Sequence, residues 1–201
     1  MSKILDKQFK LLLERERRFA KNVVYLIRAQ TPRTWWHIFI PFKFLLEYRD
    51  LKKDIRHYTA KYVTLKHIAL SAAYRAAVTN DREKNQQTMQ AELRDFCLRN
   101  QKIPSQEAYE LLKQWMDLLF QHYYRLFLIP ERDYSKLIRQ AYTSSAEYRS
   151  FLGQLNTLEQ GLDQAVQSAS GGEGSDLHIQ QKQKALQDLR SREINDMYQI
   201  Y

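Results

Sequence analysis

The sequence is poor in the residues that make turns, since it holds 5 glycines and 4 prolines among 201 residues. A β-sandwich or an α/β enzyme of this length needs more turn residues, so the shortage favours long helices. A single cysteine, Cys97, excludes a disulfide framework and a cysteine-rich metal site. One cysteine is also typical of a protein in a reducing cytosol, and the N-terminal residues hold no apolar stretch of the kind found in signal peptides.

Motifs of catalysis and cofactor binding are missing as well. The five histidines show no H-x-x-x-H or H-E-x-x-H spacing, and no G-x-S-x-G occurs. Three glycines fall within residues 168–175, but no Lys-Ser or Lys-Thr follows them as in a phosphate-binding loop. His122 lies on an apolar stripe, which predicts a hydrogen-bonded core histidine. The sequence therefore predicts a protein that is not an enzyme and that needs no metal or cofactor.

Positive charge is concentrated in the first third of the chain. Residues 1–75 hold 17 Lys and Arg against 6 Asp and Glu, whereas residues 76–201 hold 15 against 17. An asymmetry of this kind indicates an anionic partner for the first third, either a lipid headgroup surface or nucleic acid. A solvated basic face that only keeps the protein soluble is the alternative interpretation.

Apolar residues recur at helical spacing through most of the chain. From Leu5 to Leu26 they are separated by steps of three or four residues, with Glu16 as one acidic interruption. Similar stripes run from Ile55 to Ala76, from Ala108 to Ile129 and from Tyr148 to Val166. No segment alternates with the period of two that a half-buried strand requires. The sequence predicts an all-α fold, an antiparallel bundle of long helices.

Composition divides the chain into three parts. Residues 168–175 (SASGGEGS) have the composition of a flexible linker. The sequence predicts a helical bundle over residues 1–169, a flexible linker over 170–175 and an amphipathic C-terminal helix over 176–201. Because this last helix is mostly polar, we expect it to be loosely tethered and to add little to the core. It would then offer a contact surface for a protein partner or for self-association.

The segment Trp35–Tyr48 (WWHIFIPFKFLLEY) is the most unusual part of the sequence. Its apolar character surrounds the whole segment instead of forming one stripe, and Pro41 interrupts it. A helix needs about 20 apolar residues to span a bilayer, whereas about 10–14 are typical of a core helix or an interfacial segment. The sequence therefore excludes a single membrane-spanning pass here.

One interpretation places this segment in one leaflet of a membrane, with the indoles at the headgroup level and Pro41 turning the chain back. Basic residues on both sides would then bind anionic headgroups, each for about 1 kcal/mol. The residues predicted to insert are Trp35, Trp36, Phe39, Ile40, Phe42, Phe44 and Leu45, and those predicted to bind headgroups are Arg28, Arg33, Lys43, Arg49, Lys52 and Lys53.

Two other interpretations remain open. In the first, the aromatic segment fills the core of the bundle, and the protein is a soluble module for protein–protein interaction. In the second, the basic third binds nucleic acid, since Arg15, Arg17, Arg18 and Lys21 cluster on one helix and 13 tyrosines offer stacking platforms. No helix-turn-helix spacing, RNP pattern or zinc finger accompanies these residues, so nucleic acid is the less favoured partner.

Two stretches of the sequence resemble a known family. Ile40-Pro41-Phe42 with Phe44-Leu45-Leu46, and Phe151-Leu152-Gly153-Gln154-Leu155 with Glu159 and Val166, resemble a family of small, uncharacterised bacterial proteins from anaerobes. The resemblance covers most of the chain in the same order. It implies a bacterial, intracellular protein with the I-P-F segment as a family feature, and it implies no activity, cofactor or site residue.

From the sequence we therefore predict a peripheral membrane adaptor or scaffold at the cytoplasmic face of the inner membrane. Its expected partners are an anionic membrane surface and either another protein or a second copy of the chain. The soluble interaction module is the alternative.

Overall fold

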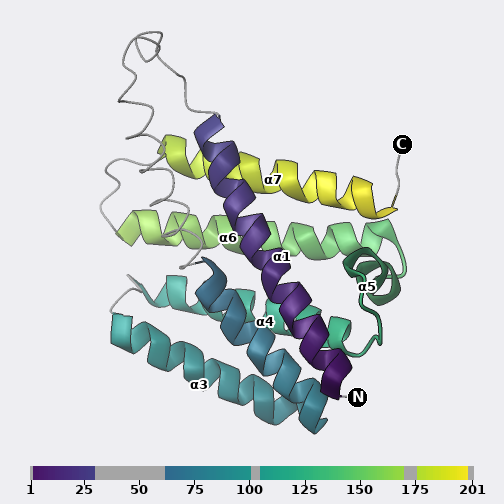
Figure 1. Ribbon diagram of the computed structural model, residues 1–201. Coiled ribbons are helices and arrows are strands. Elements are labelled where there is room, and N and C mark those ends of the chain that lie inside the picture. Colours follow the sequence, from purple (N-terminus) through teal and green to yellow (C-terminus); the bar gives the residue numbers. More distant parts are fainter. Residues whose placement is uncertain (1, 30–61, 101–104, 170–175, 199–201) are drawn as a thin grey trace, which may run out of the picture.

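The computed structural model describes residues 2–29, 62–100, 105–169 and 176–198, and all regular structure within them is α-helical (Figure 1). The predicted fold class is thus confirmed. The elements are α1 (Ser2–Ala29), a helix over residues 62–79, α3 (Arg82–Asn100), α4 (Gln106–Phe127), α5 (Tyr134–Ala141), α6 (Ser145–Ala169) and α7 (Asp176–Tyr198).

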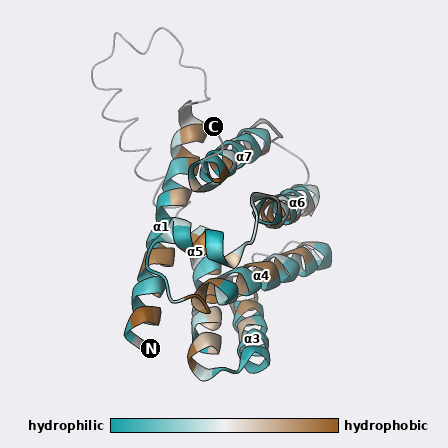
Figure 2. Ribbon diagram, turned by 90° about the vertical axis from the view of Figure 1, so that its right-hand side faces the viewer, coloured by the Kyte–Doolittle hydropathy of each residue, from teal (hydrophilic) through white to brown (hydrophobic). Residues whose placement is uncertain are grey.

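Helices α7, α6, α4 and α3 form a layer, and α1 and the helix over residues 62–79 lie across it (Figure 1). In the view of Figure 1, α7, α6, α4 and α3 follow one another from top to bottom, and α1 crosses in front of them. Figure 2, turned by 90°, shows α1 at one edge of the molecule. Direct packing joins α4 to α6, α6 to α7, and α7 to α1. One long side of α1 therefore faces the bundle, and the opposite side faces solvent.

Local polar side chains cap the first turns of α4 and α5. The Ser105 hydroxyl accepts a hydrogen bond from the Ala108 backbone N–H at 3.1 Å, and the Asp133 carboxylate accepts one from the Lys136 backbone N–H at 2.9 Å. Such caps satisfy backbone donors that the first turn of a helix leaves without a partner.

The core takes buried side chains from α1, the helix over residues 62–79, α3, α4, α5, α6 and α7. Small residues of the helix over residues 62–79 are completely buried, so its neighbours pack closely against it; they are Ala69, Ala72, Ala73 and Ala76. The largest side chains without solvent contact are Tyr123, Tyr148, Phe120, Leu12, Leu70, Met89, Leu93, Met116, Leu119, Leu126, Leu137 and Ile138.

The C-terminal helix differs from its prediction as a loosely tethered element. Helix α7 packs on both α1 and α6, and four of its apolar residues are buried, namely Ala185, Leu186, Ile194 and Met197. Two charged residues on the same side, Arg190 and Glu193, are buried with them. Although α7 is mostly polar in composition, one of its faces is therefore turned inward and buried. The predicted linker over 170–175 lies outside the described residues.

The turn between the helix over residues 62–79 and α3 depends on Asn80, whose φ angle is +53°. Asparagine tolerates this left-handed conformation, whereas a β-branched residue does not. We expect Asn80→Val to lower the free energy of unfolding by about 1–2 kcal/mol. The matched variant Asn80→Gly should leave it nearly unchanged, because the Asn80 side chain is exposed. Urea unfolding measures both, and equal stabilities of the two variants would contradict this account of the turn.

Candidate functional site: the basic outer face of α1

The predicted membrane segment lies outside the described residues. This applies to every predicted insertion residue from Trp35 to Leu45 and to the predicted headgroup residues from Arg33 to Lys53. Arg28 lies in the last turn of α1, so the backbone position of one predicted headgroup residue is described. The two leading interpretations of the aromatic segment therefore stay predictions, and the described site is the helix that leads into it.

The solvent side of α1 carries a row of basic residues. They recur at helical spacing, all of them are exposed, and we call them the basic face: Lys3, Lys7, Lys10, Arg17 and Lys21. At 1.5 Å per residue the row is about 27 Å long. Glu14 is the acidic residue that falls within it, and Tyr25, with 52% of its surface exposed, continues it towards the end of the helix.

The charges of the basic face are available to a partner. No described residue forms an ion pair with any of its five members. Glu14 pairs instead with Arg18 at 3.6 Å, and both side chains are about two-thirds exposed. An exposed pair of this kind contributes little stability and exchanges readily with solvent or a ligand.

A buried ion pair fixes the rotation of α1 about its axis. Glu16, the acidic interruption of the apolar stripe, accepts hydrogen bonds from Lys66 Nζ and from the Tyr123 hydroxyl, both at 2.7 Å. Lys66 also lies 4.4 Å from the centre of the Tyr62 ring. A buried charge is tolerated only when it is paired and hydrogen-bonded. These contacts hold Glu16 inward and thereby hold the basic face outward.

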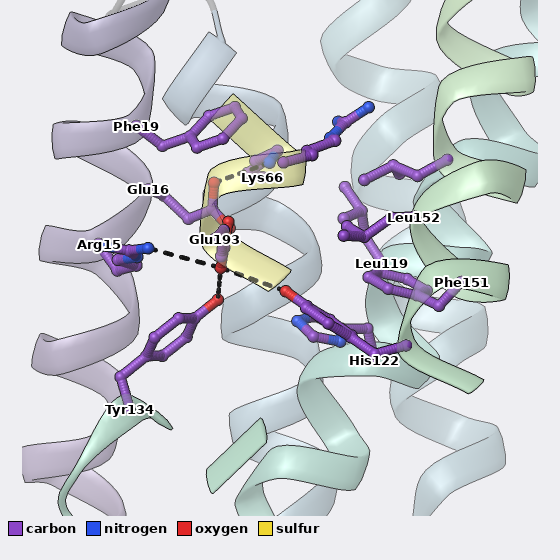
Figure 3. Close-up of a pocket in the computed structure, with 13 residues that line it drawn as sticks. Arg15, Glu16, Phe19, Lys66, Leu119, His122, Tyr134, Phe151, Leu152 and Glu193 are labelled. Atoms are coloured by element: carbon purple, nitrogen blue, oxygen red, sulfur yellow. Dashed lines mark hydrogen bonds and ion pairs between the residues drawn. The ribbon is translucent and has the colours of Figure 1, made fainter. Parts of the chain in front are cut away.

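A second buried carboxylate connects α7 to α1 (Figure 3). Glu193 accepts hydrogen bonds from the hydroxyls of Tyr134 at 2.9 Å and Tyr148 at 3.2 Å, and it lies 3.6 Å from the Arg15 guanidinium. Burial opposes the charge of Arg15, but Glu193 and Tyr134 more than offset this and raise its pKa. Burial, with Glu193 close by, raises the pKa of Tyr134 well above its usual value. Both tyrosines therefore stay protonated and donate.

A third buried carboxylate connects α6 to α7. Glu159 is held by Arg190 through both carboxylate oxygens, at 2.9 and 3.0 Å, and it accepts a bond from the Trp115 indole at 3.2 Å. Arg190 also donates to Asn156. Both contacts with Glu159 come from Nη2 of Arg190, and charge-assisted hydrogen bonds of this kind are stronger than neutral ones.

The cavity among these charges is too small for a substrate. Its volume is about 30 Å³, and charged residues from α1, α7 and the helix over residues 62–79 line it together with apolar side chains. A space of this size accommodates about one water molecule. We therefore assign the cluster to positioning the helices, not to chemistry on a ligand.

His122 is the hydrogen-bonded core histidine that the sequence predicts. Its Nδ1 lies 2.6 Å from the Tyr142 hydroxyl, and its ring stacks on Phe151 with centroids 4.4 Å apart. Burial, with Lys66 and Arg125 as the nearby charges, lowers the pKa of His122 to about 3. The imidazole is therefore neutral at physiological pH. In the described ranges no group of His, Cys, Asp and Glu is arranged to hold a metal ion.

The basic cluster proposed from the sequence is divided by the structure. Arg17 and Lys21 point to solvent, whereas Arg15 is turned towards Glu193. Lys3, Lys7 and Lys10 were not included in that cluster, although they continue the outward row. The sequence could have indicated these three lysines, because they are separated by four and three residues, the same spacing that the apolar stripe of this helix follows.

None of the helices in the described part of the chain is both long and apolar enough to cross a bilayer. Comparison of the chain with protein-family models, with curated proteins and with solved structures finds no match. The resemblance to a family of small bacterial proteins therefore stays a prediction.

The Glu16–Lys66 pair predicts a specific pattern of stabilities. Glu16→Gln should lower the free energy of unfolding by about 3–5 kcal/mol, because it leaves the Lys66 charge buried without its partner. Adding Lys66→Met should recover most of the loss, since glutamine still accepts from Tyr123. The exposed pair supplies the control, and Glu14→Gln should cost less than about 0.5 kcal/mol. Equal losses for Glu16→Gln and Glu14→Gln in chemical denaturation would refute the assignment.

The lowered pKa of His122 predicts a pH dependence of stability. In the unfolded chain a histidine titrates near pH 6.5, so between about pH 6.5 and 3 the unfolded state binds a proton that the folded state does not. The free energy of unfolding should therefore decrease as the pH is lowered through this window, by up to about 1.4 kcal/mol per pH unit.

The variant His122→Gln isolates this contribution, because glutamine retains an acceptor for the Tyr142 hydroxyl. The stability advantage of the wild type over His122→Gln should shrink steadily as the pH falls below 6.5. His67→Gln, at an exposed histidine, serves as the control. A constant difference between wild type and His122→Gln from pH 7 to pH 4 would exclude the predicted linkage.

Proposed function

We propose that the protein is a peripheral membrane adaptor or scaffold that binds an anionic lipid surface through α1 and the aromatic segment that follows it. The observation that carries the proposal is the basic face of α1, a row of five exposed cations without ion-pair partners among the described residues. The sequence continues from this helix into Trp35–Tyr48 within a few residues. Cations beside indoles are typical of segments that bind the headgroup region of a membrane.

The energies involved are sufficient for reversible attachment. Each lysine or arginine near an anionic surface contributes about 1 kcal/mol, and salt weakens this attraction because the Debye length shortens. Insertion of aromatic side chains adds an apolar contribution that salt does not screen. Either contribution alone gives weak binding, so we expect attachment to need both.

Liposome flotation tests the electrostatic part of the proposal. The wild type should float with vesicles of phosphatidylglycerol and phosphatidylcholine, and it should float much less with phosphatidylcholine alone or in 1 M NaCl. Reversal of Lys10, Arg17 and Lys21 to Glu should abolish flotation. All three side chains are exposed, so the fold should persist.

A matched variant distinguishes an effect of the basic face on flotation from an effect of net charge. Reversal of Lys84, Arg94 and Arg149 to Glu changes the net charge equally, at exposed positions of α3 and α6. This control should float like the wild type. Absence of wild-type flotation with every lipid mixture, or equal losses in the two triple variants, would overturn the proposal.

The aromatic segment is tested separately by Trp35→Glu/Phe39→Glu. If the segment inserts into lipid, the double variant should stay folded and lose flotation. If the segment is core, as in a soluble interaction module, the variant should unfold or aggregate, because a buried charge without a partner costs several kcal/mol. Circular dichroism with flotation distinguishes the two outcomes. Gel retardation of nucleic acid that the α1 triple reversal abolishes, in a protein that does not float, would favour the nucleic-acid interpretation instead.

A further inference from the structure

A groove on the side of α1 is separate from the basic face. It lies between α1, α5 and α7, and its volume is about 230 Å³. Helix α1 contributes Leu11, Arg15 and Arg18 at spacings of four and three residues, which places them on one side of the helix. The first turn of α5 contributes Tyr134 and Ser135, and α7 contributes Glu193, Asp196 and Met197.

The two long walls of this groove carry opposite charges. Arg15 and Arg18 line the groove from α1, and Glu193 and Asp196 line it from α7. Leu11 and Met197 add an apolar surface between them. A ligand with only one sign of charge is repelled by one of the walls, whereas a ligand with both charges complements them.

Some charged groups of the groove are already held by hydrogen bonds within the protein, and others remain open to a ligand. Glu193 is occupied by Tyr134, Tyr148 and Arg15. Asp196 is exposed and pairs with no described residue, and Arg18 has only the exposed contact with Glu14.

Arg15 lines the groove with 39% of its side chain exposed, and its terminal nitrogen lies 3.6 Å from Glu193. Guanidinium groups favour oxygen acceptors such as phosphate or carboxylate.

We propose that the groove between α1, α5 and α7 binds a small zwitterionic amine–phosphate group. The phosphate lies at the guanidiniums of Arg15 and Arg18, and the ammonium group lies at Asp196. The volume is below the range of about 300–1,000 Å³ that holds drug-sized ligands, so the group is a small one. A soluble amine phosphate and the headgroup of an aminophospholipid share this chemistry.

NMR titration of the full chain with O-phosphoethanolamine tests the site without any membrane. The amide signals of α1, α5 and α7 around the groove should shift. Inorganic phosphate alone and ethanolamine alone should each bind at least about tenfold more weakly, because each satisfies only one wall. Equal binding of either single-charge compound would overturn the zwitterionic assignment.

Variants at exposed positions keep the fold intact. Arg18→Gln and Asp196→Asn should each weaken binding about tenfold or more, which is the loss of one charge-assisted hydrogen bond. Arg94→Gln is the matched control, because Arg94 is an exposed arginine of α3 that does not line the groove, and it should leave binding unchanged.

Vesicles distinguish the two sources of the group. If the site takes a lipid headgroup, phosphatidylethanolamine vesicles should shift the same signals in an Arg18-dependent way, and the free compound should bind weakly. Absence of Arg18-dependent binding with both the free compound and the vesicles would refute the site. Because neither Arg18 nor Asp196 belongs to the basic face, this result and the flotation of the α1 triple variant are independent.

Discussion

The contact of Glu16 with Lys66 and Tyr123 is the constraint on which the position of α1 depends. A carboxylate that is largely buried is stable only beside a cation and a hydrogen-bond donor, and both lie on the core side of the helix. Rotation of α1 by one residue, about 100°, would move Glu16 away from both. The basic face lies on the opposite side of the same helix. The buried pair thus determines which charges of α1 face solvent.

The same principle explains how a polar C-terminal helix becomes part of the bundle. Arg190 and Glu193 are one turn apart on α7, and each meets an opposite charge on a different helix, Glu159 on α6 and Arg15 on α1. Buried ion pairs add little net stability, but a misplaced helix would leave two charges without partners at a cost of several kcal/mol. The pairs therefore select one register for α7, and Ala185 and Leu186 supply the apolar contact.

The sequence predicts those parts of this structure that depend on neighbouring residues. The helical stripe from Ala108 to Ile129 and the burial of His122 on it follow from helical spacing. The partners of Glu16 do not, because Lys66 and Tyr123 are 50 and 107 positions away along the chain. The docking of α7 was missed for a related reason. Composition counts its charges as solvated, and only the folded chain shows that Arg190 and Glu193 are satisfied internally.

The four consecutive charged residues Arg15-Glu16-Arg17-Arg18 show why composition alone does not locate a binding surface. Successive residues of a helix are rotated by about 100°, so these four side chains point in three directions. Glu16 enters the core, Arg17 joins the basic face, and Arg15 and Arg18 line the groove beside α7. No single partner contacts all three arginines on one face of α1. The two binding surfaces that we propose, the basic face and the groove, therefore draw on different residues of one basic stretch.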